Sequence, residues 1–424
     1  MLHGNCCEPA AGLPRQTVGF ERVALPLLPL EVAARLAPLG GLVWLDSAIS
    51  GPGAISVLTA GPVEIIAGDL ATDSEKIQSA LKKQAFAAPG LAYMPAGGLF
   101  GWIGFDGRFV LGVYPRCLIF AHDTGTWFDV GGLAADLKDP VTRKVAPLDF
   151  HPLLPRADFI EAVDRARQYI AAGDIYQVNL SYPWSAPWPA EADALAFYER
   201  LRDVSPAPFG AYLDLTDTRI CSASPECFLK MSGRDILTRP IKGTRPRFPA
   251  DVGLDDQALD DLTHSEKERA ELLMITDLER NDLGIVCDYG SITVPELWKV
   301  ESFAQVHHLV STVTGTLRSD VDHVAALRAC FPGGSISGAP KKRALEIIHE
   351  LERFPRGIYT GAIGYFGFNG ESQFNIAIRT AVQTGDQITF HVGAGIVADS
   401  VPEHEYEETL HKAAGILRAA KLSD

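Results

Sequence analysis

The chain has 424 residues, of which 47% are hydrophobic and 21% are charged. These values are ordinary for a globular protein, and a chain of this length can bury a large core, so a disordered chain, a fibrous repeat and a coiled coil are excluded. The formal charge of −15, from 38 basic and 53 acidic side chains, disfavours nucleic acid and anionic membranes as partners, because both bind basic surfaces.

The sequence also carries no signal for secretion or membrane insertion. No apolar stretch is long enough to span a bilayer, and the first residues, MLHGNCCEPA, lack the basic and apolar parts of a signal peptide. The 7 cysteines are odd in number and form no C-x-x-C pair, which disfavours disulfides and zinc. We therefore expect a cytoplasmic protein.

A proline-rich segment at 136–157 is the clearest boundary in the chain. It holds four prolines among charged residues without a steady period, which is typical of a linker or a long surface loop. Before it, short apolar runs such as GLVWLDSA and GGLFGWIGFD alternate with glycine and predict strands and turns. The prediction is an N-terminal subdomain, 1–150, followed by a second region, 151–424.

The second region begins with a predicted helix and strand. From Asp158 onward apolar residues recur at helical spacing. The next segment, IYQVNLS at 175–181, alternates as a β-strand does, so that Gln177, Asn179 and Ser181 would share one face. This polar face could line a cavity, and a solvent-facing sheet edge fits the alternation equally well.

A basic strand follows, TRPIKGTRPR at 238–247. It places Lys242 among Arg239, Arg245 and Arg247. Neighbouring positive charges disfavour a further one, so part of the Lys242 amine would be uncharged near neutral pH and could act as a nucleophile or base if these side chains converge. An electropositive binding strand without chemistry is the alternative, and this segment alone favours it.

Two predicted helices, at 264–278 and after Ser400, offer carboxylates. Each carries a pair of glutamates three residues apart: Glu268 with Glu271, and Glu405 with Glu408. Such pairs share a helix face, and Mg²⁺ binds one or two carboxylates together with water and substrate oxygens. The alternative is that these acids only stabilise helix starts, since Ser265 and Ser400 precede them as capping residues would.

Glycine-rich turns and a strand arginine point to an anionic ligand. FPGGSISGAPKKRALEII, at 331–348, leads into a helix and offers backbone N–H groups, although it is not a Walker A loop. GAGIVADS, at 393–400, is a second such turn, and Arg379 in FNIAIRT could bind a carboxylate through two parallel hydrogen bonds. Together these segments predict a small polyanionic ligand and a divalent metal.

These stretches are recognisable as a set. Nine of them occur in the order found in chorismate-utilising enzymes, with dense similarity over 155–415: GDIYQVNLS, ASPECFL, RPIKGTRPR, ERAELLMITDLERNDLG, VHHLVSTVTGTL, FPGGSISGAPKKRALEIIHELE, GAIGYF, NIAIRT and GAGIVADSVPEHEYEET. The chain therefore resembles that family. The resemblance implies an α/β (α+β-like) fold in which two large β-sheets are sandwiched between helices, with the active site between them. The substrate would be chorismate, a dicarboxylate with a C4 hydroxyl and an enolpyruvyl ether.

Within the family the chain most resembles the subgroup of aminodeoxychorismate synthase component I, because relatives that make anthranilate usually have alanine where Lys242 stands. In that subgroup the lysine is thought to attack C2 as the C4 hydroxyl leaves, and ammonia then adds at C4 and expels the lysine. The resemblance implies Lys242 as the nucleophile, Glu226 as the general acid or base, and His308 beside the ring. Isochorismate-forming relatives have lysine where Gln177 stands, so amination is favoured over addition of water.

The resemblance also implies the residues that bind substrate and metal. Mg²⁺ would be bound directly by Glu271 and Glu408, mostly through water by Glu268 and Glu405, and would neutralise the ring carboxylate. The residues against the substrate would be Gly243, Thr244, Tyr359, Arg379, Gly393, Ala394 and Gly395. Of these, Tyr359, Arg379 and the amides of 393–395 would hold the enolpyruvyl carboxylate.

The source of ammonia would be a separate protein. The chain has no G-x-C-x-G turn that could carry a glutaminase nucleophile, and no segment resembles a lyase. The resemblance therefore implies a separate glutamine amidotransferase subunit as partner. Anthranilate synthase component I and a catalytically inert chorismate-binding protein remain as alternatives, and whether tryptophan binds near VWLDSA is left open.

Overall fold

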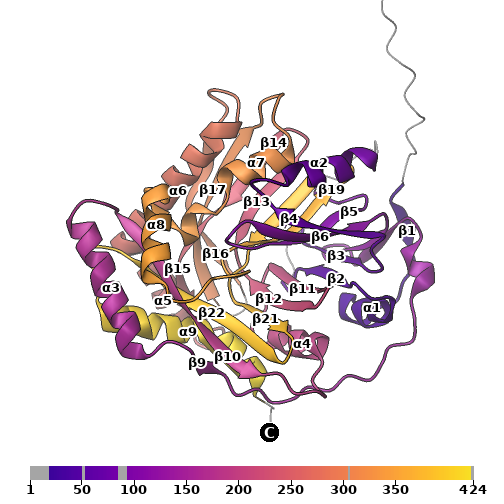
Figure 1. Ribbon diagram of the computed structural model, residues 1–424, viewed down its shortest axis with the longest axis horizontal. Coiled ribbons are helices and arrows are strands. Elements are labelled where there is room, and N and C mark those ends of the chain that lie inside the picture. Colours follow the sequence, from indigo (N-terminus) through magenta and orange to yellow (C-terminus); the bar gives the residue numbers. More distant parts are fainter. Residues whose placement is uncertain (1–18, 50–52, 85–92, 304–305, 422–424) are drawn as a thin grey trace, which may run out of the picture.

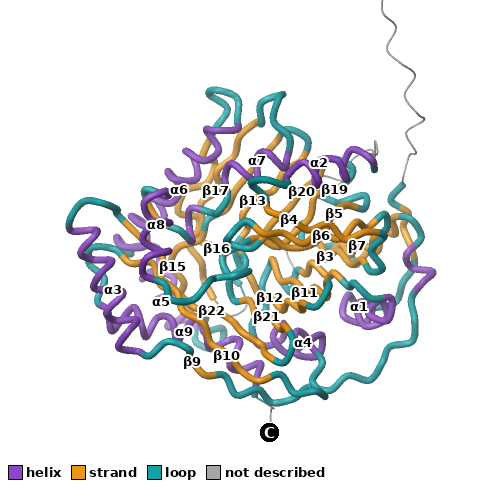
Figure 2. Tube along the Cα trace, viewed as in Figure 1, coloured by secondary structure: helices purple, strands orange, loops and turns teal. Residues whose placement is uncertain are grey.

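The computed structural model describes residues 19–49, 53–84, 93–303 and 306–421. Within these ranges the chain forms two large antiparallel sheets with helices packed around them (Figure 1, Figure 2). This confirms the predicted architecture of two sheets sandwiched between helices. No helix in the described ranges is long and apolar enough to cross a membrane.

The first sheet has twelve strands. They are β1 (Glu21–Val23), β2 (Val43–Asp46), β3 (Ile55–Thr59), β7 (Cys117–Ala121), β8 (Thr126–Val130), β9 (His151–Pro152), β10 (Gln177–Pro187), β11 (Phe209–Leu215), β12 (Thr218–Ser224), β18 (Gly338–Ala339), β21 (Thr380–Thr384) and β22 (Gln387–Ile396). Their order is β1-β8-β7-β3-β2-β11-β12-β21-β22-β10-β18, with β9 paired to β10.

The second sheet has ten strands. They are β4 (Glu64–Asp69), β5 (Gly98–Ile103), β6 (Arg108–Tyr114), β13 (Cys227–Ser232), β14 (Asp235–Arg239), β15 (Ile241–Pro246), β16 (Thr293–Ser302), β17 (Val306–Thr316), β19 (Ala362–Gly367) and β20 (Glu371–Ile376). Their order is β15-β17-β14-β13-β20-β19-β5-β6-β4, with β16 paired to β17.

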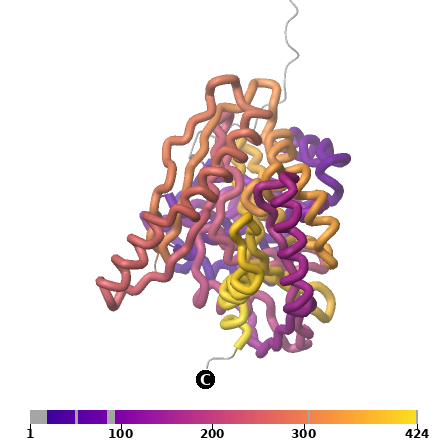
Figure 3. The backbone as a smooth tube through the Cα atoms, turned by 90° about the vertical axis from the view of Figure 1, so that its left-hand side faces the viewer, coloured from indigo at the N-terminus to yellow at the C-terminus, as the bar shows by residue number. Residues whose placement is uncertain are grey.

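Helices cover both sheets. They are α1 (Pro29–Leu36), α2 (Ser74–Lys83), α3 (Arg156–Ala171), α4 (Ala194–Val204), α5 (Val252–His264), α6 (Glu266–Val286), α7 (His323–Cys330), α8 (Lys341–Leu351) and α9 (Pro402–Ala420), with short 3-10 turns at Ala37–Leu39, Leu133–Asp136 and Gly334–Ile336. Helices α3, α4, α8 and α9 pack on the first sheet, where α3 and α9 lie side by side (Figure 3). Helices α2 and α6 pack on the second sheet, and α7 packs against both of them.

The N-terminal strands join both sheets instead of forming a layer of their own. In the first sheet β2 pairs with β11, and in the second sheet β5 pairs with β19. Large side chains such as Phe100, Tyr114 and Tyr365 fill a core cluster that spans the two sheets. The division at residue 150 stays a sequence-based prediction, because strands from both parts of the chain share the two sheets.

The described cysteines are free and buried, as their scattered positions predicted: Cys117, Cys221, Cys227, Cys287 and Cys330. Burial raises the pKa of each of these thiols, so none is a reactive thiolate near neutral pH. Cys6 and Cys7 lie outside the described residues.

Candidate active site

A cavity of about 770 Å³ lies where β15 and β17 of the second sheet face β22 of the first. Helices α6 and α9 complete its wall. Most of the residues that sequence patterns pointed to line it: Glu226, Lys242, Gly243, Thr244, Glu268, Glu271, His308, Tyr359, Arg379, Gly393, Gly395 and Glu408. Segments that are far apart in sequence therefore meet in one place, as the family resemblance implied.

Two predicted residues, Ala394 and Glu405, do not line the cavity. The Ala394 side chain is fully buried in the core on the other face of β22, so only its backbone could meet a ligand. Glu405 is also buried, and burial raises its pKa while a hydrogen bond from Ser400 opposes the rise. Ser400 does not cap α9 as predicted, because the helix begins after Val401.

Lys242 reaches from the second sheet across to the first. Its Nζ lies 3.6 Å from the point where a Cβ on Gly395 would stand. The same point is only 2.5 Å from Nε2 of Gln177 on the neighbouring strand β10. A side chain at position 395 would therefore collide with Gln177, so glycine at 395 keeps open the space that the lysine amine faces.

Glu226 and Arg379 sit where the chain passes from one sheet to the other. Glu226 lies between β12 of the first sheet and β13 of the second, and Arg379 lies between β20 and β21. The two crossings are adjacent, since the Ala223 N–H donates to the Arg379 carbonyl at 3.0 Å. The carboxyl group of Glu226 and the guanidinium of Arg379 are thereby carried by neighbouring crossings between the two sheets.

Glu226 is suited to hold a proton. It is 5% exposed, and burial raises its pKa to about 7, although a hydrogen bond donated by Ser335 and the positive charge of Lys242 oppose the rise. A carboxyl group that titrates near neutral pH can donate a proton to a leaving group and take one back.

The arginines around Lys242 do not act as the sequence suggested. Arg245 forms an ion pair with Glu268 at 3.4 Å, and Arg239 and Arg247 are likewise paired to carboxylates of other segments. Lys242 instead faces carboxylates, since its charge acts on both Glu271 and Glu408. The condition that these arginines converge on Lys242 is therefore not met, because each of them pairs with a carboxylate of another segment.

Glu271 and Glu408 bring carboxylates from α6 and α9 to the same cavity. Burial raises the pKa of Glu271, Lys242 opposes the rise, and the negative charge of Glu408 adds to it. For Glu408 burial acts in the same direction, but Lys412, 2.7 Å away, and other cations outweigh it and lower the pKa. The two carboxylates are thus near neighbours that local lysines neutralise.

The donor set fits Mg²⁺ better than a metal held by protein alone. In the part of the chain that the structure describes, no group of three or more His, Cys, Asp or Glu side chains is arranged to hold a metal. Mg²⁺ binds hard oxygen donors, and one or two carboxylates together with water and substrate oxygens complete its coordination. Glu271 and Glu408 could supply this pair.

Arg379 is a cation without an anion. Its guanidinium has no ion pair or hydrogen bond with any described residue, its backbone φ is 50°, and burial lowers its pKa. Because a desolvated guanidinium is costly unless it is paired, its position in the cavity wall marks an anion site. The anion-binding role that sequence patterns gave Arg379 stays a prediction, and they did not indicate its left-handed backbone.

His308 is neutral. Its Nδ1 lies 2.9 Å from the Thr244 hydroxyl, which stands opposite it on β15. Burial lowers the pKa of His308 to about 3, and the nearby Arg379 lowers it further, so the ring carries no charge at physiological pH. It can position Thr244 and the ligand but cannot serve as a cationic acid.

Two groups of residues at the site were not anticipated. His391 lines the cavity and stacks on Tyr359, with ring centroids 5.2 Å apart and an angle of 16° between the planes. The alternation of β22, which places it on the same face as Gly393 and Gly395, was the signal that could have found it.

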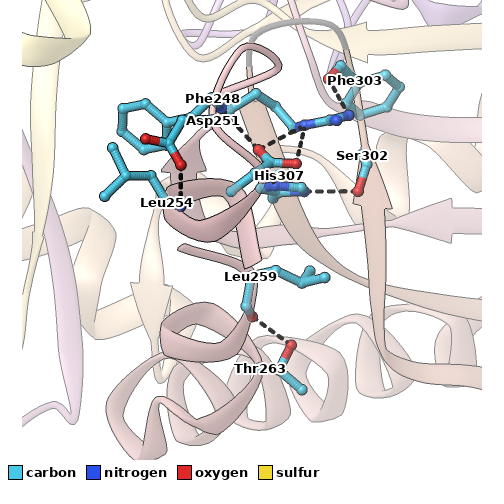
Figure 4. Close-up of polar contacts among 10 residues, drawn as sticks. Phe248, Asp251, Leu254, Leu259, Thr263, Ser302, Phe303 and His307 are labelled. Carbon is cyan, nitrogen blue, oxygen red and sulfur yellow. Dashed lines mark hydrogen bonds and ion pairs between the residues drawn. The ribbon is translucent and has the colours of Figure 1, made fainter. Parts of the chain in front are cut away.

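The second group is a polar network around Asp255, which includes His307, the residue before His308 in the chain. Figure 4 shows the contact between His307 and Ser302 in this network. Asp255 accepts hydrogen bonds from Arg247 Nε at 3.0 Å and from the Phe248 N–H at 2.8 Å. Nε2 of His307 lies 3.2 Å from the same carboxylate, and its Nδ1 lies 2.7 Å from the Ser302 hydroxyl. The network ties α5 to β16 and to β17, the strand that carries His308.

Fold and cavity agree with the comparisons to known proteins. The sequence matches the family of chorismate binding enzymes over residues 133–418, and the chain belongs to this family. It is 48% identical over 267 residues to aminodeoxychorismate synthase component 1 of Bacillus subtilis, covering 63% of this chain and 56% of that protein. It is 47% identical over 263 residues to an anthranilate synthase component 1 of Haloarcula marismortui, covering 62% and 52%. The chain thus spans about half the length of the curated relatives it matches.

Solved structures show the same fold. The anthranilate synthase component I of Streptococcus pneumoniae superposes with a TM-score of 0.75 at 28% identity, covering 87% of this chain and 93% of that one. MenF, the menaquinone-specific isochorismate synthase of Escherichia coli, gives a TM-score of 0.78 over 97% of each chain, at 18% identity. Proteins of different named activities therefore share these two sheets, so the activity of this chain has to be argued from its site.

Proposed function

We propose that this chain is component I of an aminodeoxychorismate synthase, which converts chorismate and ammonia to 4-amino-4-deoxychorismate and water. The observation that carries the proposal is Lys242, whose amine faces Gly395 across the cavity and whose charge acts on Glu226. An amine, a proton-holding carboxyl and an unpaired Arg379 are what a dicarboxylate with a poor leaving group requires.

In the proposed first step, Lys242 Nζ forms a bond to C2 as the ring double bonds shift and the C4–O bond breaks. Glu226 gives its proton to the departing oxygen, which leaves as water. Ammonia then forms a bond to C4, the double bonds shift back, and the C2–N bond breaks with return of its electron pair to Lys242. Glu226 takes up the proton that the new ammonium group releases, so the enzyme ends as it began.

Glu271 and Glu408 would hold Mg²⁺, with Glu268 and Glu405 around them. The bound cation would supply positive charge to the ring carboxylate while negative charge shifts into it. A cation held there would also lie beside Lys242, whose charge acts on both carboxylates.

Ammonia would come from a separate glutamine amidotransferase subunit, in keeping with the name component 1 of the similar proteins. The second candidate function is anthranilate synthase component I, which the comparable identity to such proteins favours. The two functions differ in product, because anthranilate formation releases pyruvate and gives a fluorescent aromatic amine.

The test is to incubate the pure chain with chorismate, Mg²⁺ and excess ammonium salt, and to identify products by chromatography with mass detection. We expect 4-amino-4-deoxychorismate without pyruvate; anthranilate with pyruvate would overturn the proposal. The Lys242→Ala variant should lose amination with ammonia, and full retention of the rate would contradict the covalent mechanism.

A further inference from the structure

His391 is a buried polar side chain that the described residues leave without a hydrogen-bond partner. It is 9% exposed and lies in the cavity wall. Neither ring nitrogen has a hydrogen-bond partner among the described residues, and Nδ1 is completely buried. Because burying an unpaired polar group costs stability, such a ring in a cavity wall is poised for a partner from outside the chain.

The surroundings of His391 place that partner. Its ring stacks on Tyr359, so both side chains face the same part of the cavity. On β22 it shares a face with Gly393 and Gly395, and a Cβ on Gly393 would stand 2.9 Å from Oδ1 of Asn179. Without side chains at these two positions, the space beside the imidazole stays open to a ligand.

The imidazole is neutral and therefore keeps one N–H. Burial lowers the pKa of His391 to about 3, and the positive charge of Arg356 lowers it further. Arg356 itself is engaged, in an ion pair with Glu352 at 2.7 Å, and does not supply a partner for the ring. With Nδ1 completely buried, the tautomer that carries its proton on Nε2 puts the donor on the other nitrogen.

Building on the function proposed above, we propose that His391 is a substrate-binding residue, which donates a hydrogen bond from Nε2 to the enolpyruvyl carboxylate of chorismate beside Tyr359 and Arg379. Arg379 would neutralise that carboxylate, and His391 would accept no charge but would orient it. The contact would give Nε2 a hydrogen-bond partner, while Nδ1 faces the protein interior.

The test compares two substitutions at this position with one control. His391→Phe keeps a ring to stack on Tyr359 and removes both nitrogens, while His391→Gln restores an N–H donor without the ring. His349→Phe, on the exposed side of α8, is the control for a histidine-to-phenylalanine change. Calorimetry with Mg²⁺ would measure the Kd for chorismate, and thermal unfolding would measure the Tm of each variant.

We expect His391→Phe to raise the Kd for chorismate about tenfold, the loss typical of a hydrogen bond to a charged group, without lowering the Tm. His391→Gln should recover part of the affinity, and His349→Phe should change nothing. The lowered pKa of His391 keeps the ring neutral from pH 6 to pH 8. The ratio of Kd values between variant and wild type should therefore stay constant over this range. Unchanged affinity in the phenylalanine variant, or a loss of affinity that follows a lower Tm, would overturn the inference.

A second ligand locates the contact. For trans-3,4-dihydroxycyclohexa-1,5-diene-1-carboxylate, which lacks the enolpyruvyl group, His391→Phe should leave the Kd unchanged; equal weakening of both ligands would refute the assignment to the enolpyruvyl carboxylate. If the wild type binds chorismate and makes anthranilate, the proposed function fails while the role of His391 in binding stands. If the wild type does not bind chorismate, both fail.

Discussion

The two sides of the cavity differ in whether their charged and polar groups are paired within the protein. On the anion side, the Arg379 guanidinium has no ion pair or hydrogen bond with a described residue, and His391 has no hydrogen-bond partner among them. The neutral His308 contacts Thr244. The guanidinium and the imidazole N–H are thus free to bind a ligand. On the carboxylate side, Glu268 and Glu408 are already paired with Arg245 and Lys412. On the anion side the binding groups are unpaired. On the carboxylate side the proposed Mg²⁺ would have to replace the ion pairs that Glu268 and Glu408 make with Arg245 and Lys412.

This difference predicts where substitutions cost function and where they cost stability. A residue on the anion side contributes little to the folded state, because it makes no internal ion pair to lose. A residue on the carboxylate side is balanced by lysines, and its removal leaves those cations near one another.

The largest effect is expected from Glu271→Gln. The amide cannot neutralise a divalent cation, so Mg²⁺-dependent turnover should fall about a thousandfold or more, consistent with loss of charge stabilisation in the transition state. The calorimetric signal for Mg²⁺ should weaken in parallel. The matched control is Glu266→Gln on the exposed start of the same helix α6, which should bind Mg²⁺ and turn over as the wild type does. Equal loss in both variants would contradict a specific role for Glu271.

Glu226→Gln comes next. Removing the proton donor should lower kcat by about 100-fold or more with little change in KM. Because burial raises the pKa of this carboxyl to about 7, its acid form is present below that pH and is lost above it, so the wild-type kcat should fall as the pH rises through 7. Stability has the same sign, since a raised pKa favours folding at low pH. The variant should therefore gain Tm over the wild type at pH 8 and not at pH 5, and a Tm deficit at pH 8 would argue against a buried carboxylate there.

Sequence patterns indicated many of the residues that line the cavity but few of the ion pairs that these residues and their neighbours make. The spacing of Glu268 with Glu271 placed both on one helix face, and both line the cavity as expected. The partners of Arg239 and Arg247 could not be read, because each carboxylate comes from another segment and no local periodicity connects them. The expected convergence of the arginines on Lys242 failed for that reason.

The fold shows the same boundary between local and long-range information. Alternation over 175–181 predicted one shared face for Gln177, Asn179 and Ser181. Val178 and Leu180, which alternate with them, lie in the core, since a strand periodicity is local. Which sheet each N-terminal strand enters was not predictable, because β3 and β4 are neighbours in the chain yet lie in different sheets. Glu226 and Arg379 gain their positions from such crossings between sheets, which leave no pattern in the sequence.

Arg379→Gln tests the anion side. We expect KM for chorismate to rise about 10-fold to 100-fold, because a charge-assisted, two-bond contact to a carboxylate is lost. The Tm should not fall, since the guanidinium has no ion pair or hydrogen bond with the described residues and glutamine meets the same backbone conformation. Steady-state kinetics and thermal unfolding of the same preparation check both statements. A lower Tm with an unchanged KM would reverse the contrast drawn between the two sides.

The smallest effect is expected from Asp255→Asn, in the network that ties α5 to β16 and β17 (Figure 4). The backbone hydrogen bond from Phe248, and then the contacts with Arg247 and His307, hold the pKa of Asp255 below its usual range. A lowered pKa contributes stability that is present above the ordinary range of aspartate and is lost as the pH falls through the folded value. The variant should therefore unfold roughly 1–2 °C earlier at pH 7, as for a solvent-accessible ion pair, and the gap should close at pH 3. Because Asp255 acts on the frame and not on the ligand, kcat and KM should stay close to wild type; a large loss of kcat at unchanged Tm would place this network in the chemistry of the site.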